Sequence, residues 1–184
     1  MKRAALTIAL AAVSAVSASG TPASFQVRST FGQYGPIPID NTCDWGDTSP
    51  AIGWRAVPAG TKSLALIMDD PDAPDPAAPQ VVWVHWVVYD IPADALGLPK
   101  NATRKNLPKG TRMGINDWKQ QAYRGPCPPV GEHRYFFKLY ALDVELPDLD
   151  GPTKADLEKA MEGHVLGKAE LVGKYKHSVK KPQE

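Results

Sequence analysis

The 184-residue sequence lacks the features of several large functional classes. Its formal charge of +1 leaves no excess of basic residues for nucleic acid binding. No repeat with a period of about 20–50 residues is visible, so a solenoid is excluded. The longest apolar stretch, residues 4–16, is shorter than the roughly 20 residues of a membrane-spanning helix. The chain therefore suits one globular domain without nucleic acid as a partner.

Short catalytic motifs are also missing. The sequence contains no G-x-S-x-G element, which argues against a serine hydrolase. It contains no H-x-H or H-x-x-x-H pair, the spacings in which histidines commonly share a metal ion. Any chemistry must come from residues that are distant in the sequence.

The N-terminus has the three parts of a secretory signal peptide. Lys2 and Arg3 are followed by the apolar residues 4–16 and the small residues 17–19. We expect a signal peptide over residues 1–18 and a single domain over residues 19–184. The protein is accordingly expected to be periplasmic or secreted.

Cysteine occurs only twice, as Cys43 and Cys127. An even number of cysteines in an exported protein is compatible with a disulfide, because disulfides persist in oxidising compartments. Two free buried thiols are the alternative, since the sequence does not show how far apart the two residues lie.

Proline and glycine are abundant, with 18 and 15 residues, and they separate short apolar runs. This pattern predicts an all-β fold with minor α content and long loops. The expected strands are residues 25–31, 52–57, 63–68, 81–91 and 134–144. One C-terminal helix is expected from Lys154 to Tyr175, with Thr153 as its N-cap and His164 as a packing residue.

An acidic segment, residues 69–74, directly follows the expected strand 63–68. It contains three aspartates and two prolines, and prolines stiffen a loop so that its carboxylates can be aimed at a ligand. Aspartate and proline are also ordinary turn residues, so a plain turn is the alternative. Arg134, if buried, needs a carboxylate partner, for which Asp69 or Asp70 is the candidate.

Two histidines are expected near these carboxylates. Strand alternation places His85 on the same face as Trp83, and His133 on the same face as Tyr135. The long irregular region between them, residues 92–133, is of the kind that often carries function.

Three ordered motifs carry a resemblance to a known family. They are Asp70-Pro71-Asp72-Ala73-Pro74, Trp83-x-His85-Trp86, and Gly125-Pro126-Cys127-Pro128-Pro129-x-Gly131-x-His133-Arg134-Tyr135. With them the chain resembles the phosphatidylethanolamine-binding protein family, and most of all its bacterial Raf kinase inhibitor-like branch. It departs from that branch at Trp45, where glycine is usual, and at Asp47, where asparagine is usual.

The resemblance implies an antiparallel β-sandwich-like fold around a central sheet, with a small anion pocket at one end. It implies no metal and no cofactor. The ligand-binding residues that it implies are Asp70, Asp72, Trp83, His85, Gly125, Pro126, His133 and Tyr135.

The expected function is therefore non-enzymatic binding of phosphate or phosphoryl head groups such as that of phosphatidylethanolamine. In this hypothesis His85 and His133 are both cationic, and the Gly125 N–H and the Tyr135 hydroxyl donate to phosphoryl oxygens. A weak peripheral membrane contact of the Lys-rich residues 174–181 is a further hypothesis, with a solvated tail as the alternative. Two rival functions remain: a metal-dependent hydrolase that uses the two aspartates and two histidines, and a protease-inhibitor-type protein whose partner is unknown.

Overall fold

The computed structural model describes residues 24–177, so the predicted signal peptide and the end of the Lys-rich tail lie outside the described residues. In chain order the elements are β1 (Gln26–Arg28), β2 (Gly35–Pro36), the 3-10 helix η1 (Ile39–Asn41), β3 (Ile52–Arg55), β4 (Ser63–Ala73), β5 (Val81–Pro92), β6 (Gly97–Leu98), β7 (Arg112–Met113), β8 (Glu132–Leu142), α1 (Lys154–Met161) and β9 (Val165–Lys176). Within this part of the chain, no helix has the length and apolar character needed to cross a membrane.

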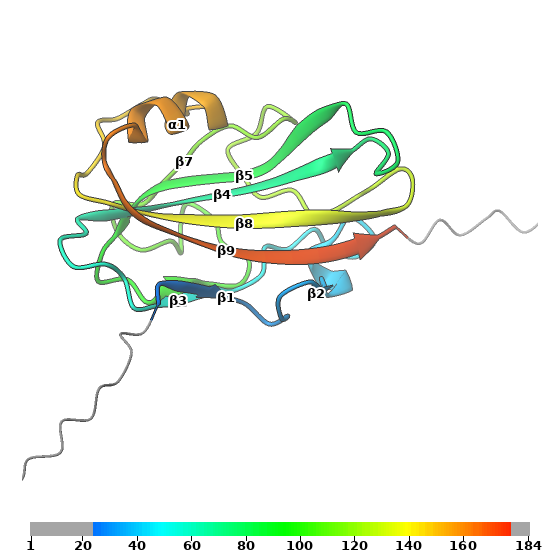
Figure 1. Ribbon diagram of the computed structural model, residues 1–184, viewed down its shortest axis with the longest axis horizontal. Coiled ribbons are helices and arrows are strands. Elements are labelled where there is room, and N and C mark those ends of the chain that lie inside the picture. Colours follow the sequence, from blue (N-terminus) through cyan, green and yellow to red (C-terminus); the bar gives the residue numbers. More distant parts are fainter. Residues whose placement is uncertain (1–23, 178–184) are drawn as a thin grey trace, which may run out of the picture.

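The elements form three layers (Figure 1). The large sheet has the strand order β2-β9-β8-β4-β5-β7, and its long strands β9, β8, β4 and β5 are antiparallel. The small sheet, β1-β3-β6, covers one face of the large sheet, and α1 covers the other. The prediction of an all-β fold around a central antiparallel sheet is confirmed.

Strand β4 contributes to both hydrophobic cores, because successive side chains of a strand point to opposite faces of the sheet. Its residues in the core between the two sheets are Leu64, Leu66 and Met68, and those in the core beneath α1 are Ala65 and Ile67. The same alternation directs Asp69 toward α1 and Asp70 toward the opposite face. Two adjacent carboxylates are thereby separated by the sheet itself.

The acidic segment belongs to β4 and is not a loop after it, so the predicted strand end at Met68 is wrong. Asp69 pairs with Val84 of β5 and with Phe136 of β8. Asp70 pairs with Trp83. Sheet pairing, and not proline stiffness alone, therefore fixes the direction of these carboxylates.

A β-bulge interrupts β5 at His85. Met68 pairs with Trp86 and Asp69 pairs with Val84, so His85 is the extra residue. Beyond the bulge Trp86 packs between the sheets and Val87 packs toward α1, which reverses the faces that uninterrupted alternation along β5 would give residues 86–89. Bulges often redirect side chains next to functional sites. Here the bulge places His85 and Trp86 on the same side of the sheet.

The predicted C-terminal helix is wrong beyond its first two turns. Thr153 caps α1 as expected, in a capping box with Asp156, but the helix ends at Met161. The chain then turns at Gly163, whose φ is +78°, and continues as β9. Pairing of β9 along the whole of β8 overrides the helical spacing of its apolar residues. His164 lies in this turn and is exposed, so the predicted packing role is wrong.

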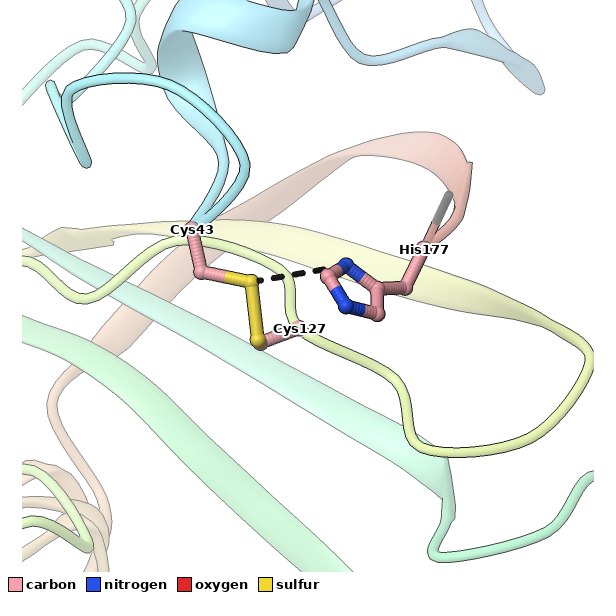
Figure 2. A group of neighbouring side chains, drawn as sticks. All are labelled: Cys43, Cys127 and His177. Atoms are coloured by element: carbon pink, nitrogen blue, oxygen red, sulfur yellow. Dashed lines mark hydrogen bonds between the residues drawn. A yellow bond between two sulfur atoms is a disulfide. The ribbon is translucent and has the colours of Figure 1, made fainter. Parts of the chain in front are cut away.

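The Cys43–Cys127 disulfide joins the loop after η1 to the proline-rich segment before β8 (Figure 2). The two Cα atoms are 5.4 Å apart, and the bonded residues are separated by 84 positions in the sequence. The Cys43 N–H donates to the Pro126 carbonyl at 3.1 Å, so the backbone also joins these two segments.

A buried ion cluster holds α1 to the sheet. The fully buried Asp69 carboxylate accepts hydrogen bonds from Lys138 Nζ at 2.7 Å and from Lys154 Nζ at 2.5 Å. Lys154 is the first residue of α1, whereas Lys138 lies on β8. Two ammonium groups thus offset the cost of burying one carboxylate.

We predict that Asp69→Asn lowers the free energy of unfolding by roughly 3 kcal/mol, because two ammonium groups then lose their charged partner. Urea denaturation measures this change. The matched control is Asp143→Asn, which removes an exposed carboxylate paired with His164 and should cost about 1 kcal/mol or less. Equal effects of the two substitutions would show that Asp69 is not a stabilising centre.

Candidate functional site

A cavity of about 470 Å³ lies at the end of the large sheet where β4, β5 and β8 carry the predicted site residues. Five of the eight line it, namely Asp70, Trp83, His85, His133 and Tyr135. The other walls come from Trp118 and from a set of prolines, Pro74, Pro128 and Pro129. The cavity is therefore mainly aromatic and apolar, with a few polar groups that converge in it, which is typical of small-molecule sites.

Asp72 is not part of the cavity lining. Its carboxylate accepts hydrogen bonds from Arg134 Nε at 2.9 Å and from a terminal guanidinium nitrogen at 2.6 Å. The predicted partners of Arg134, Asp69 and Asp70, are thus wrong, and its side chain is 49% exposed rather than buried. Hydrogen bonding to Arg134 lowers the pKa of Asp72, against the opposing effect of burial. The Asp72 carboxylate therefore binds the Arg134 side chain and does not line the cavity.

Gly125 and Pro126 also lie outside the lining, and the Gly125 N–H is already engaged by another residue. It donates to Asp47 Oδ1. A Cβ at this position would lie 2.5 Å from the Asn41 carbonyl oxygen, so the close backbone approach requires glycine. Both residues therefore connect the loop after η1 to the cavity wall.

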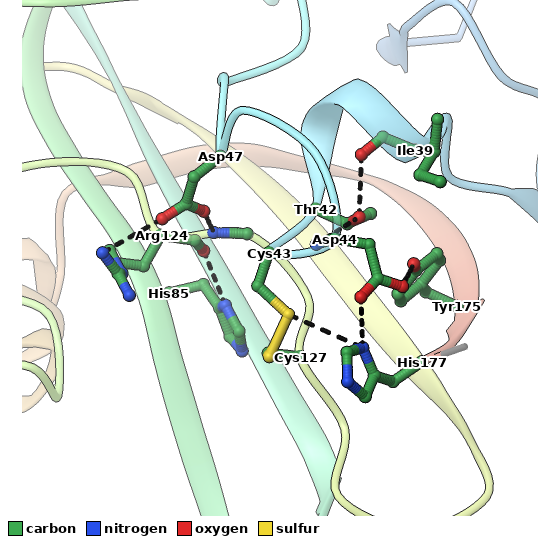
Figure 3. Close-up of a disulfide and its surroundings, with 11 residues drawn as sticks. Ile39, Thr42, Cys43, Asp44, Asp47, His85, Arg124, Cys127, Tyr175 and His177 are labelled. Atoms are coloured by element: carbon green, nitrogen blue, oxygen red, sulfur yellow. Dashed lines mark hydrogen bonds and ion pairs between the residues drawn. A yellow bond between two sulfur atoms is a disulfide. The ribbon is translucent and has the colours of Figure 1, made fainter. Parts of the chain in front are cut away.

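The surroundings of His85 favour the neutral imidazole over the predicted imidazolium. Burial lowers its pKa to about 4, and the hydrogen bond to Arg124 opposes this shift only in part. The ring Nδ1 lies 2.7 Å from the Arg124 carbonyl oxygen (Figure 3). Because a carbonyl oxygen only accepts, Nδ1 carries the hydrogen and Nε2 carries the lone pair. His85 can thus accept a hydrogen bond from a ligand.

Asp47 supports this tautomer. It accepts from the Gly125 N–H, and its other oxygen lies 3.1 Å from the Arg124 guanidinium. The peptide unit that presents the Arg124 carbonyl to His85 is therefore held from both sides.

His133 has both ring nitrogens engaged. Nδ1 lies 2.7 Å from Asp70 Oδ2, and Nε2 lies 2.9 Å from the Val130 carbonyl oxygen. The pair fits either an imidazolium beside a carboxylate or a neutral imidazole beside a protonated Asp70. Burial raises the pKa of Asp70, whereas the hydrogen bond from His133 opposes that shift. Both arrangements engage both ring nitrogens, so a direct contact of His133 with an anion stays a prediction that requires one of these hydrogen bonds to break.

The Tyr135 hydroxyl is the donor that the cavity leaves unused. It is buried and makes no hydrogen bond of good geometry with any residue in the range 24–177. Asp70 is nevertheless close enough to contribute to its raised pKa, whose main cause is burial. The ring lies edge-on to His85 with centroids 5.2 Å apart. Tyr135 thus remains a protonated donor at neutral pH, in the cavity that His85 also lines.

Trp118 is the wall residue that sequence reasoning missed. Its ring lies edge-on to Trp83 at 5.4 Å and to His85 at 5.0 Å. It belongs to the irregular region between β7 and β8, where no periodicity assigns a direction to any side chain. The sequence indicated a role for Trp118 only through the presence of a large aromatic residue in a long loop.

Of the four predicted ligands of a metal-dependent hydrolase, Asp70, His85 and His133 line the cavity and Asp72 does not. Asp72 is bound to Arg134, and both His133 nitrogens are occupied. Among residues 24–177, one group of three or more His, Cys, Asp or Glu side chains could hold a metal ion, and it comprises Cys43, Cys127 and His177.

Comparisons with known proteins agree with this architecture. Residues 27–176 match the family model described as phosphatidylethanolamine-binding protein. A UPF0098 protein of Methanothermobacter thermautotrophicus is 51% identical over 147 residues, which cover 79% of this chain and 94% of that protein.

Solved structures extend the likeness. A putative phosphatidylethanolamine-binding protein homologue from Chlamydia trachomatis has a TM-score of 0.76 and 37% identity, over 84% of this chain and 98% of its own. YbcL of E. coli has a TM-score of 0.75 and 34% identity, over 84% and 99%. A carboxypeptidase Y inhibitor bound to its proteinase shares the fold alone, at 19% identity and a TM-score of 0.52 over 82% and 81%. The chain belongs to the phosphatidylethanolamine-binding protein family.

Proposed function

We propose that this protein is an exported, non-enzymatic binding protein for small phosphoryl head groups that bring a hydrogen-bond donor into the cavity. A single observation carries the proposal: Tyr135, whose buried hydroxyl makes no hydrogen bond of good geometry within residues 24–177, and His85, whose Nε2 is left as an acceptor, line the same cavity of about 470 Å³. A phosphoryl oxygen would accept from Tyr135, and a P–O–H or an ammonium N–H would donate to His85 Nε2.

Electrostatics favours a ligand that retains a proton. The lining of the cavity contains the carboxyl group of Asp70, and both ring nitrogens of His133 are already engaged, one of them by that carboxyl group. A phosphate dianion would therefore meet repulsion without a free cation. An ammonium group would instead gain from the aromatic walls of Trp83 and Trp118. Free phosphoethanolamine in its singly deprotonated phosphoryl form combines both groups. As the head of a lipid the phosphoryl group is a diester monoanion without a P–O–H, and the ammonium group is then the donor.

The rival functions have less support. A hydrolase would need metal ligands or an activated nucleophile in the cavity, and the paired states of Asp72 and His133 supply neither. The likeness to a carboxypeptidase Y inhibitor extends to the fold alone, so it identifies no partner enzyme. The proposal that the protein is exported is supported by the basic, apolar and small-residue segments near the N-terminus.

We predict that the affinity for phosphoethanolamine falls as the pH rises above about 6, by up to tenfold per unit, because a phosphoryl monoester loses its second proton there. The dianion offers no P–O–H to His85 and is repelled by Asp70. Calorimetric titration between pH 5 and 8 measures this dependence. An affinity that stays constant or rises over that range would contradict the protonated ligand.

We predict that Tyr135→Phe weakens phosphoethanolamine binding by about 10-fold to 100-fold, because a hydrogen bond to a charged oxygen is lost. The free energy of unfolding should stay the same or increase, since the substitution removes a buried hydroxyl that has no partner. Tyr140→Phe, on the opposite side of the sheet, is the control and should bind normally. Unchanged binding by Tyr135→Phe would remove the main support for the proposal.

A further inference from the structure

We propose that reduction of the Cys43–Cys127 disulfide creates a zinc site formed by the two thiolates and His177. One potential ligand atom from each of these residues lies within 4.8 Å of the others (Figure 2). The three residues come from the loop after η1, the proline-rich segment and the end of β9, which the fold brings together. Cys127 also lines the cavity that holds Tyr135 and His85, so the two sites adjoin, but the zinc site uses neither of those side chains and does not depend on the proposed ligand.

The spacing fits zinc coordination. With Zn–S bonds of about 2.3 Å and Zn–N bonds of about 2.0 Å, tetrahedral geometry places neighbouring ligand atoms roughly 3.5–3.8 Å apart. Cys43 Sγ lies 3.8 Å from His177 Nδ1, so the imidazole ring is already beside this sulfur, and Nε2 is the nitrogen left for zinc because Nδ1 faces Asp44. After reduction the two sulfurs need to separate from bonding distance to the tetrahedral spacing, and both lie on loops rather than on paired strands.

The surroundings of His177 resemble those of a metal-bound histidine. Its Nδ1 lies 2.6 Å from Asp44 Oδ1, and the Tyr175 hydroxyl donates to the other oxygen of Asp44 (Figure 3). A carboxylate that accepts from one ring nitrogen leaves the lone pair on the other, which is the usual arrangement around zinc. The ring edge that carries both nitrogens faces the sulfurs (Figure 2). The orienting partners of a zinc ligand are thus already in place.

The chemistry balances with a dithiol as the reductant. The dithiol gives two electrons and two protons to the S–S bond, which becomes two thiols, and the dithiol itself becomes a disulfide. Zinc then displaces both thiol protons and forms two Zn–S bonds and one Zn–N bond, with water in the fourth position. Cys127 is exposed and Cys43 partly so, which gives both the reductant and the metal access.

The test is zinc titration of the purified chain, reduced and then freed of the dithiol without oxygen, in competition with a chromophoric chelator. We expect one zinc per reduced chain and none for the oxidised chain. Cobalt should give a thiolate charge-transfer absorption in the reduced chain alone. Absence of zinc binding by the reduced chain, folded or not, would overturn the proposal, as would equal binding by the oxidised chain.

Variants assign the ligands. His177→Ala should weaken zinc binding at least tenfold, and Asp44→Asn by about 10-fold to 100-fold through loss of the orienting carboxylate. His164→Ala, an exposed histidine that also pairs with an aspartate, is the matched control and should bind as the parent does. A Cys43→Ser, Cys127→Ser chain should show no cobalt charge-transfer band, and its circular dichroism reports whether the fold survives without the disulfide. Parent-like affinity in His177→Ala would refute the proposed ligand set.

Discussion

Hydrogen-bonded pairing of β4 with β5 on one side and β8 on the other sets the direction of the carboxylates on which the structure depends. Asp69 and Asp70 are neighbours in the chain, yet one lies among lysines beneath α1 and the other lies in the cavity. The backbone of a central strand cannot rotate to exchange them, because both of its edges are paired. Asp69 in the ion cluster and Asp70 in the cavity are thus adjacent in the chain but lie in different environments.

Burial then decides where the protons are. His85 is buried with a carbonyl oxygen at one nitrogen and is consequently a neutral acceptor. His133 is buried between a carboxylate and a carbonyl oxygen and consequently has no free N–H. Two histidines of similar location thereby differ in what they offer a ligand. In the proposed function, the choice of ligand depends on matching the ligand's hydrogen-bond donors and acceptors to those of the cavity more than on net charge.

The family resemblance indicated the five predicted residues that line the cavity, Asp70, Trp83, His85, His133 and Tyr135. Strand alternation by itself placed only His85 with Trp83 and His133 with Tyr135, because these residues lie on long strands with a period of two. Trp118, Asp47 and His177 act from loops or from the end of a strand, where direction depends on tertiary contacts that no local pattern encodes. The helical spacing of residues 154–175 led to a wrong prediction because the structure there is also decided by a tertiary contact. Strand β8 offers β9 a complete set of hydrogen-bond partners.

The separation of the cavity from the ion cluster by one strand also bears on changes in chain length. An insertion or deletion of one residue in β4 before Asp69 would move each later side chain to the other face of the sheet. Asp70 would then lie among the lysines and Asp69 beside the cavity, so both environments would change together. The loops between β5 and β8 carry no such constraint over most of their length. Relatives should therefore differ in length within those loops and share one length in β4.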